Sequence, residues 1–316
     1  MPPTGQMRSI ILDVDTGIDD AWALVYAAQS PILNLMGVTT VFGNADLDRT
    51  TRNTLAVLDL LHRETPVFRG ADRPLIRPWG GPVPEYHGHN GLGDAPVPGP
   101  KRRSEPLDAA HYIRAAVRKH PGEVTLVMVA RLTNLARALL YDPGLAPLIE
   151  RVVLMGGAAF CPGNVTPVAE ANIWGDPEAA DLIFQSNIPI TMVGLDVTMQ
   201  APFTKDQLER LDPNRPYASL LRQATAFYMA AYELGNPSIQ GWCPLHDPLA
   251  VAVAEDPSLV KTQRYPVRVE THGRWTDGMT VVDARQPHQG CIEVATQLDG
   301  PRFLRTFHQR IGVMSS

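Results

Sequence analysis

The fold of this chain can be inferred from one short segment, Ile10-Ile11-Leu12-Asp13-Val14-Asp15-Thr16-Gly17-Ile18-Asp19-Asp20. Its first three residues are large and aliphatic, which is typical of a strand buried on both faces. Strong helix formers follow the acidic stretch from Ala21 to Ala28 and predict a helix. The segment therefore predicts a buried strand, an acidic loop and a helix, in that order.

The same alternation of strand and helix continues along the chain. Further strands are predicted at 35–41, 66–68, 124–129, 152–155 and 188–193, and helices at 50–61, 108–118, 132–140 and 177–184. This order predicts an α/β fold with a mostly parallel open sheet and helices on both faces. Additional C-terminal strands are predicted at 265–271, 279–283 and 292–297.

No polar, low-complexity linker divides the chain, so we expect one domain over residues 10–316, preceded by a disordered or tag-like tail over residues 1–9. Two Pro- and Gly-rich stretches, 73–100 and 235–248, interrupt the regular pattern. Long loops inside an ordered α/β domain are commonly lids over a functional site.

Composition excludes several classes of function. The 28 basic and 33 acidic side chains give a net charge of −5, which argues against nucleic acid or an anionic membrane as the main partner. No stretch approaches 18 apolar residues, so we expect no membrane span. The N-terminus lacks the apolar core of a secretory signal, and the three cysteines lack C-x-x-C spacing. We therefore expect a cytoplasmic protein without structural disulfides.

The four carboxylates of Asp13, Asp15, Asp19 and Asp20 repel one another and call for a compensating cation. Carboxylate oxygens suit Ca²⁺ or Mg²⁺, and no Cys or His cluster nearby favours zinc. In open parallel sheets, ligands bind at the carboxyl ends of the strands, where this loop is expected. The simpler interpretation is a solvated turn with Asp19 or Asp20 capping the following helix, which accounts for one Asp and not for four.

A second interpretation starts from Asp13-x-Asp15, which is similar to the nucleophile motif of haloacid-dehalogenase-like phosphatases. In such a Mg²⁺-dependent phosphatase the first Asp attacks phosphorus and the second acts as acid and base. We keep it as an alternative function.

Two further polar segments are candidates for the site. His246-Asp247-Pro248 precedes an apolar run, so Asp247 is either a helix cap or a carboxylate ligand beside the proton donor His246. The segment from Asn164 to Asn172 offers two amides and Glu170, which suit the recognition of sugar hydroxyls.

Asn44 follows a predicted strand and is either a turn residue or another reader of hydroxyls. His87 lies in the first long loop, where it is either exposed without a role or carried by a lid. Phe227, Tyr228 and Tyr232 recur at helical spacing, which favours core packing over contact with a substrate.

Taken together, these residues resemble the inosine-uridine preferring nucleoside hydrolases from Ile10 to about Gly312. The motifs that carry the resemblance are, in chain order, Asp13-Val14-Asp15-Thr16-Gly17-Ile18-Asp19-Asp20-Ala21, Thr39-Thr40-Val41-Phe42-Gly43-Asn44, His87-Gly88, Leu132-Thr133-Asn134, Val153-Leu154-Met155-Gly156-Gly157, Val168-Ala169-Glu170-Ala171-Asn172, Asp176-Pro177-Glu178-Ala179-Ala180 and His246-Asp247-Pro248. The resemblance implies a Rossmann-like fold, a bound Ca²⁺, hydrolysis of the N-glycosidic bond of ribonucleosides and a homodimer or homotetramer.

The resemblance also implies roles for individual residues. The Ca²⁺ ligands would be the side chains of Asp15, Asp20 and Asp247 and the backbone carbonyl of Val129. Asp15 would take a proton from the attacking water, whose pKa the cation lowers. His246, together with His87 near the base, would assist departure of the base by protonation. Asp13 would support the ligands from behind.

The substrate would be held by its sugar. Asp19 and Asn172 would bind the ribose hydroxyls, Asn164 and Glu170 the 5′-hydroxyl, and Asn44 would support the ring. Nearby negative and amide oxygens would stabilise the oxocarbenium character that develops as the bond breaks.

Two residues depart from the pattern of the family. Arg131 stands where the family usually has a small turn residue, and it brings a positive charge close to the expected ion. Ala171 replaces a common aromatic residue. Because of Arg131, a non-catalytic nucleoside- or ribose-binding protein on the same scaffold is a further alternative. His246 argues against the purine-specific branch, although Trp242 nearby keeps purines open.

Overall fold

Strand β1 (Arg8–Val14) lies inside an eight-stranded sheet in the computed structural model, which describes residues 7–286 and 290–314. The strand order is β3-β2-β1-β4-β5-β6-β12-β9, and every neighbouring pair is parallel except β12 and β9. The other strands of this sheet are β2 (Leu33–Thr40), β3 (Val67–Arg69), β4 (Val124–Met128), β5 (Arg151–Met155), β6 (Ile190–Val193), β9 (Val260–Tyr265) and β12 (Ile292–Leu298). The mostly parallel α/β sheet predicted from the sequence is confirmed.

Two small antiparallel sheets complete the strands: β7 (Pro202–Thr204) pairs with β8 (Trp242–Pro244), and β10 (Val267–Val269) pairs with β11 (Thr280–Val282). The α-helices are α1 (Ile18–Gln29), α2 (Leu47–Leu60), α3 (Pro84–His87), α4 (Ala109–Lys119), α5 (Thr133–Tyr141), α6 (Ala171–Gly175), α7 (Pro177–Phe184), α8 (Leu195–Thr198), α9 (Lys205–Glu209), α10 (Ala218–Gly235), α11 (His246–Glu255) and α12 (Gly300–Ile311). Short 3₁₀ turns occur at Ala146–Leu148 and Pro257–Leu259.

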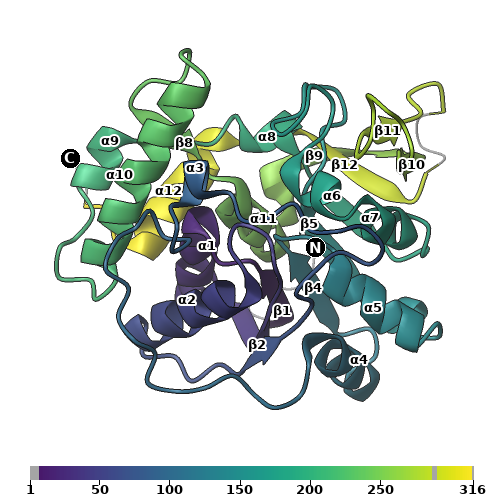
Figure 1. Cartoon of the computed structure of the whole chain (residues 1–316), viewed down its shortest axis with the longest axis horizontal. Helices are drawn as coiled ribbons and strands as arrows, with labels where there is room; N and C mark the ends of the chain where they lie inside the picture. The colour runs from purple at the N-terminus through teal and green to yellow at the C-terminus, as the bar shows by residue number, and fades with distance from the viewer. Residues whose placement is uncertain (1–6, 287–289, 315–316) are drawn as a thin grey trace.

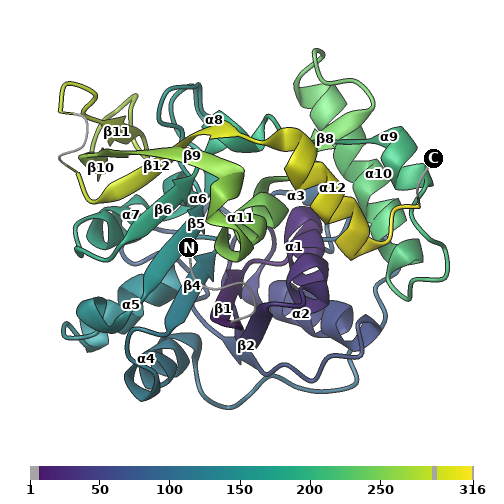
Figure 2. The same cartoon turned by 180° about the vertical axis from the view of Figure 1, so that it is seen from behind.

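The two faces of the sheet are covered by different helices. Successive side chains of a strand point to opposite faces. Accordingly, Ile10 and Leu12 belong to the core cluster that contains residues of α1, α2, α11 and α12, whereas Ile11 belongs to the cluster with α4, α5 and α7. Figures 1 and 2 show α10 and the β10–β11 hairpin at opposite ends of the molecule. The fully aliphatic start of β1 is thus explained by burial on both faces.

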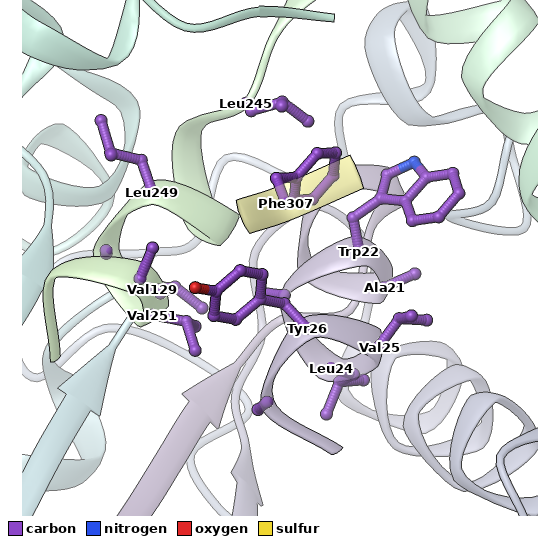
Figure 3. Close-up of a cluster of buried hydrophobic side chains, with 14 of the residues drawn as sticks. Ala21, Trp22, Leu24, Val25, Tyr26, Val129, Leu245, Leu249, Val251 and Phe307 are labelled. Atoms are coloured by element: carbon purple, nitrogen blue, oxygen red, sulfur yellow. The ribbon is translucent and has the colours of Figure 1, made fainter. Parts of the chain in front are cut away.

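Helix α1 is held by an aromatic cluster, of which Figure 3 shows Trp22, Tyr26 and Phe307. The Trp22 ring meets those of Phe203 and Phe307 edge-to-face at centroid distances of 5.8 and 6.1 Å. Its indole N–H donates a 2.8 Å hydrogen bond to the hydroxyl of Thr225. Because α1 begins directly after the acidic loop, this packing also fixes the position of the carboxylates.

Several element boundaries differ from the predictions. Strand β1 begins at Arg8, two residues inside the predicted tail, whose residues 1–6 lie outside the described part. Helix α2 begins at Leu47, not at residue 50, because the Asp46 side chain caps it by accepting from the Arg49 N–H.

At the C-terminal end the predicted strand 265–271 is wrong as a single element. Tyr265 ends β9 in the main sheet and residues 267–269 form β10 in a separate hairpin, with Pro266, which has no N–H to donate, between them. Helix α12 and strand β9 were not predicted.

The two predicted lids differ in character. Within residues 73–100, α3 is the one helix, and the remainder is irregular. Residues 235–248, in contrast, contain β8 and the first turn of α11. No helix in the described ranges combines the length and the apolarity needed to cross a bilayer.

Candidate active site

The order of the strands creates a crevice beside β1. The chain leaves β1 for β2 and β3 on one side and then returns to β4 on the other side, so that the loops after β1 and β4 diverge. In open α/β sheets such a reversal is where ligands bind. The loop after β1 and the start of α1 bring Asp15, Asp19 and Asp20 to this point, and the loops after β2 and β4 bring Asn44 and Arg131.

A cavity of about 510 Å³ opens at this edge of the sheet, a size typical of small-molecule sites. Nine of the residues predicted from the sequence line it: Asp19, Asn44, His87, Val129, Asn164, Glu170, Asn172, His246 and Asp247. The other three, Asp13, Asp15 and Asp20, are buried beside it and do not line it.

Three carboxylates come together at the buried side of the cavity. Asp19, Asp20 and Asp247 each offer an oxygen, and these three oxygens lie within 4.8 Å of one another. Burial, with repulsion from neighbouring carboxylates, raises the pKa of Asp19 to about 7 and that of Asp20 and Asp247 well above the usual range. A buried set of oxygen donors with excess negative charge fits a hard divalent cation, so these residues could hold a metal ion.

Asp20 also has a structural role. Its carboxylate accepts the N–H groups of Asp15 and Gly17 at 3.0 and 2.9 Å, which closes the N-terminus of α1. The capping role considered from the sequence is therefore real for this one residue. At the start of α11, in contrast, no side chain caps the helix, so Asp247 is not a capping residue.

Asp15 is engaged in a different way. Its carboxylate forms a buried ion pair with the Nη1 atom of Arg131 and accepts the backbone N–H of Asn44 at 2.8 Å. The Asn44 amide nitrogen bridges Asp15 and Asp20 at 3.2 and 3.0 Å. Desolvation raises the pKa of Asp15 and the Arg131 charge lowers it.

The carbonyl of Val129 is likewise occupied, because the Asn172 amide nitrogen donates to it at 3.1 Å. The same nitrogen donates to the carbonyl of Met155 at 3.1 Å, so the amide oxygen of Asn172 points toward Arg131, 3.4 Å away. Of the four predicted metal ligands, Asp20 and Asp247 are grouped with Asp19, whereas Asp15 and Val129 are not part of this group. Hydrogen bonds or ion pairs to other protein groups engage Asp15, Asp20 and the Val129 carbonyl.

Asp13 supports this arrangement from the sheet side. It is fully buried and accepts hydrogen bonds from the Thr39 hydroxyl and, at 2.7 Å, from the amide of Asn134. Asn134 also donates to the carbonyl of Thr40 and accepts the N–H of Ala71, which ties the ends of β1 and β2 to α5. A nucleophile must reach its substrate, so the burial of Asp13 away from the cavity argues against the phosphatase alternative.

Both histidines are buried and neutral. The Nδ1 atom of His87 accepts the Ile18 N–H at 3.2 Å. The two ring nitrogens of His246 lie 2.7 Å from the Thr198 hydroxyl and 2.8 Å from the Tyr232 hydroxyl. Burial lowers the pKa of each imidazole to about 3. At neutral pH neither imidazole carries a positive charge, and each holds one ring proton.

The segment from Asn164 to Asn172, which is predicted to bind sugar hydroxyls, leads into the N-terminus of α6. Glu170 accepts the N–H groups of Gly157, Asn172 and Ile173 at 2.9 to 3.1 Å. The amide oxygen of Asn164 accepts the Ala171 N–H at 3.0 Å. Both side chains are thus oriented before a ligand binds.

Sequence reasoning missed Arg77 and several aromatic residues of the cavity. Trp79, Tyr86 and Trp174 line it, as do Tyr228 and Tyr232, for which core packing was the favoured prediction. Tyr228 does belong to the core cluster, but it also faces the cavity. The signal that could have found Trp79 and Tyr86 is their position in the Pro- and Gly-rich stretch 73–100.

Arg77 links residues 73–100 to other parts of the chain through ion pairs. Its guanidinium forms ion pairs with Glu178 and Asp277, each at 2.6 Å. The three side chains are half-buried, so this network is more stabilising than an exposed pair. The loop over the cavity is consequently held in place at residue 77.

Comparisons with known proteins agree with this geometry. Residues 10–305 match the family model described as inosine-uridine preferring nucleoside hydrolase. The chain is 43% identical to a pyrimidine-specific ribonucleoside hydrolase of Shewanella sp. (strain MR-7), over 88% of this chain and 87% of the relative. It is 38% identical to an inosine-uridine preferring nucleoside hydrolase of Leishmania major, over 94% and 95%.

Among solved structures, a purine-preferring ribonucleoside hydrolase from Gardnerella vaginalis superposes with a TM-score of 0.92 at 40% identity, covering 96% of this chain and 98% of that one. The chain belongs to the family of inosine-uridine preferring nucleoside hydrolases.

Proposed function

We propose that this protein is a Ca²⁺-dependent ribonucleoside hydrolase that releases a free base and ribose. The observation that carries the proposal is the meeting of Asp19, Asp20 and Asp247 beside a cavity that also presents hydroxyl-binding amides and a hydrogen-bonded imidazole. Family membership supports the type of bond that is hydrolysed.

The sugar is bound at the polar floor of the cavity. Asp19 and the amide oxygen of Asn172, which lies 3.4 Å from Arg131, accept hydrogen bonds from the ribose hydroxyls. Asn164 and Glu170 receive the 5′-hydroxyl, since the backbone bonds described above hold both in place. Asn44 supports the ring from the side of Asp15.

The carboxylates and Val129 supply the groups for a cation, with Asp15, Asp20, Asp247 and the Val129 carbonyl as proposed ligands. A Ca²⁺ ion held by these groups would lower the pKa of water at the site. Asp15 accepts the proton of the attacking water, and its hydrogen bonds from Asn44 hold the carboxylate in position for that role. The surrounding carboxylate and amide oxygens stabilise positive charge on the ribosyl ring as the C1′–N bond breaks.

The leaving base is protonated through His246. Its contact with Tyr232 extends to Tyr228, whose hydroxyl oxygen lies 3.4 Å from that of Tyr232. His87 lies on the same cavity wall, with its ring 5.3 Å from that of Tyr228. The aromatic side chains of Trp79 and Tyr86 provide apolar surface for the base.

The identity of the preferred base is a matter for experiment. The relatives include a pyrimidine-specific and a purine-preferring enzyme at nearly equal identity, 43% and 40%. We propose that both inosine and uridine are substrates.

A non-catalytic nucleoside- or ribose-binding protein is the second candidate, and the ion pair between Arg131 and Asp15 is the observation that favours it. An Asp15 that stays paired with Arg131 would be a poor base for water. Such a protein would bind nucleoside without consuming it.

The test is turnover by the purified protein. Inosine, uridine and cytidine are incubated with the protein in Ca²⁺ or in EDTA, and free base is quantified by chromatography. We expect release of base that is lost in EDTA and restored by Ca²⁺. Saturable binding of nucleoside without any release of base at high protein concentration would establish the binding-protein alternative instead.

We also propose a cytoplasmic homodimer or homotetramer, which rests on membership of the family. Light scattering coupled to size-exclusion chromatography measures the assembly directly. A mass of one chain across the working concentration range would contradict it.

A further inference from the structure

Arg131 is a buried cation inside the candidate active site. It follows β4 directly, and its side chain is only 7% exposed. Its Nη1 atom pairs with Asp15 and lies 3.4 and 3.5 Å from the amide oxygens of Asn172 and Asn44. The three hydrogen-bond partners of this nitrogen are all oxygen atoms, an environment that would also suit a metal ion.

Two glycines make the space for this guanidinium. A Cβ atom on Gly175 would lie 2.6 Å from Nε and 2.7 Å from Cγ of Arg131, and one on Gly43 would collide with Asp15 and with Nη1. Gly175 does not have a positive φ, so its backbone does not require glycine. What glycine provides at residue 175 is room for the arginine side chain.

The charges in the site are unevenly matched. Asp15 has a cationic partner, whereas no Lys, Arg or His nitrogen within residues 7–286 and 290–314 lies within 4.0 Å of the carboxylates of Asp19, Asp20 or Asp247. Arg131 therefore neutralises one carboxylate and leaves three that repel one another. Breaking a buried ion pair by withdrawing one partner leaves an uncompensated charge, which is strongly unfavourable.

We propose that Arg131 is a resident counter-ion of the metal site, which holds Asp15 in place before a divalent cation binds and weakens the binding of that cation. The inference rests on the proposed Ca²⁺ site. An arriving cation must share Asp15 with the guanidinium or displace it, and two like charges beside one carboxylate repel each other. Ca²⁺ binding is consequently weaker and more readily reversed than in the same site without the arginine.

Arg131→Met tests the inference, because it keeps most of the aliphatic stem and removes the charge. Arg131→Lys keeps the charge. Gly175→Ala leaves Arg131 intact but places a methyl group where its side chain passes. The matched control is Arg137→Met on α5, which removes one positive charge from a half-buried arginine outside the cavity.

Calcium affinity is measured by isothermal titration calorimetry on protein freed of metal with EDTA and then desalted. We expect Arg131→Met and Gly175→Ala to bind Ca²⁺ at least about tenfold more tightly than the wild type, equivalent to about 1.4 kcal/mol. Arg131→Lys and Arg137→Met should stay close to the wild type.

Thermal unfolding provides a second readout, because a change in packing alone would not alter how much Ca²⁺ raises the Tm. In EDTA, Arg131→Met should melt below the wild type, because Asp15 loses its partner. In saturating Ca²⁺ the variant should gain more than the wild type gains, because its affinity is higher.

The possible outcomes separate this inference from the proposed function. One Ca²⁺ per chain in the wild type with no tightening in Arg131→Met and Gly175→Ala would overturn the counter-ion role and leave the hydrolase intact. Absence of Ca²⁺ binding in every variant, with nucleosides turned over in EDTA, would overturn both the calcium site and the role of Arg131.

Discussion

Asp247→Asn tests the electrostatics of the site most directly. The substitution keeps the size of the side chain and removes one of the three charges that meet beside the cavity. Asp247 is buried, and the end of α11 that carries it has no side-chain cap. We therefore expect the metal-free protein to become more stable and the calcium site to be lost.

The magnitude follows from the separation of the oxygens. Two full charges 4.8 Å apart repel by about 3.5 kcal/mol at an effective dielectric constant of about 20. Asp247 faces both Asp19 and Asp20, but protonation already relieves part of the repulsion, because the pKa of all three is raised. We expect a net gain of at least about 1 kcal/mol at pH 8, which raises the Tm by about 2 °C or more.

The pH dependence has a defined sign. The pKa of Asp247 is higher in the folded protein than in the unfolded chain, so the folded state binds more protons and loses stability as the pH rises. The asparagine variant lacks this contribution. Its advantage over the wild type should therefore be larger at pH 8 than at pH 5.

The assay is differential scanning calorimetry in EDTA and in Ca²⁺ at these two pH values, followed by turnover of inosine and uridine. Glu233→Gln on the exposed surface of α10 is the control for the change in net charge. Asp247→Asn should gain stability in EDTA, fail to gain from Ca²⁺ and lose turnover. A variant that is less stable than the wild type in EDTA at pH 8 would show that the three carboxylates are not in net repulsion.

Three further predictions address other parts of the molecule. Tyr232→Phe removes the 2.8 Å contact to His246 and should lower kcat for inosine by about 10- to 100-fold. The leaving group of p-nitrophenyl riboside needs no protonation, so this substrate should be hydrolysed at the wild-type rate. Equal losses on both substrates would contradict proton transfer through His246. Burial lowers the pKa of His87 to about 3 in the folded protein, below its value in the unfolded chain. The unfolded chain therefore takes up the proton first, and the folded protein loses about 2 kcal/mol of stability between pH 7 and pH 5. Urea unfolding should show a smaller loss in His87→Gln. Trp22→Ala should cost about 3 to 5 kcal/mol in urea unfolding, and a loss below 1 kcal/mol would mean that the cluster in Figure 3 repacks.

Much of the fold was predictable because its signals are local. Ile10 to Leu12 form a buried strand, since three adjacent aliphatic side chains need burial on both faces. Helix α12 was not predicted, although its buried residues Phe303, Phe307 and Ile311 recur at the four-residue spacing of an amphipathic helix. What the tertiary structure adds is the partner, because this face packs in the core cluster that contains α1. The division at Pro266 likewise depends on which partner strand lies on either side.

The residues of the candidate site were easier to predict than the hydrogen bonds and ion pairs between them. Asp19, Asp20 and Asp247 were expected at one place, and their oxygens do meet. That Asp15 is paired with Arg131, 116 residues away, could not be inferred, because it depends on β1 and β4 being neighbours and on the direction of a long side chain. The occupation of both nitrogens of His246 by Thr198 and Tyr232 was equally out of reach.

The chemistry proposed for this protein rests on residue types that the sequence alone supplies: carboxylates crowded after a buried strand suit a hard cation, and two amides with Glu170 suit a ligand rich in hydroxyls. Only the tertiary structure decides how the charges are shared. Arg131 can reach Asp15 because Gly175, a residue distant in sequence, has no side chain and leaves room for the arginine. Residue types indicate which charges are present, and the packing of several loops determines which of them are neighbours.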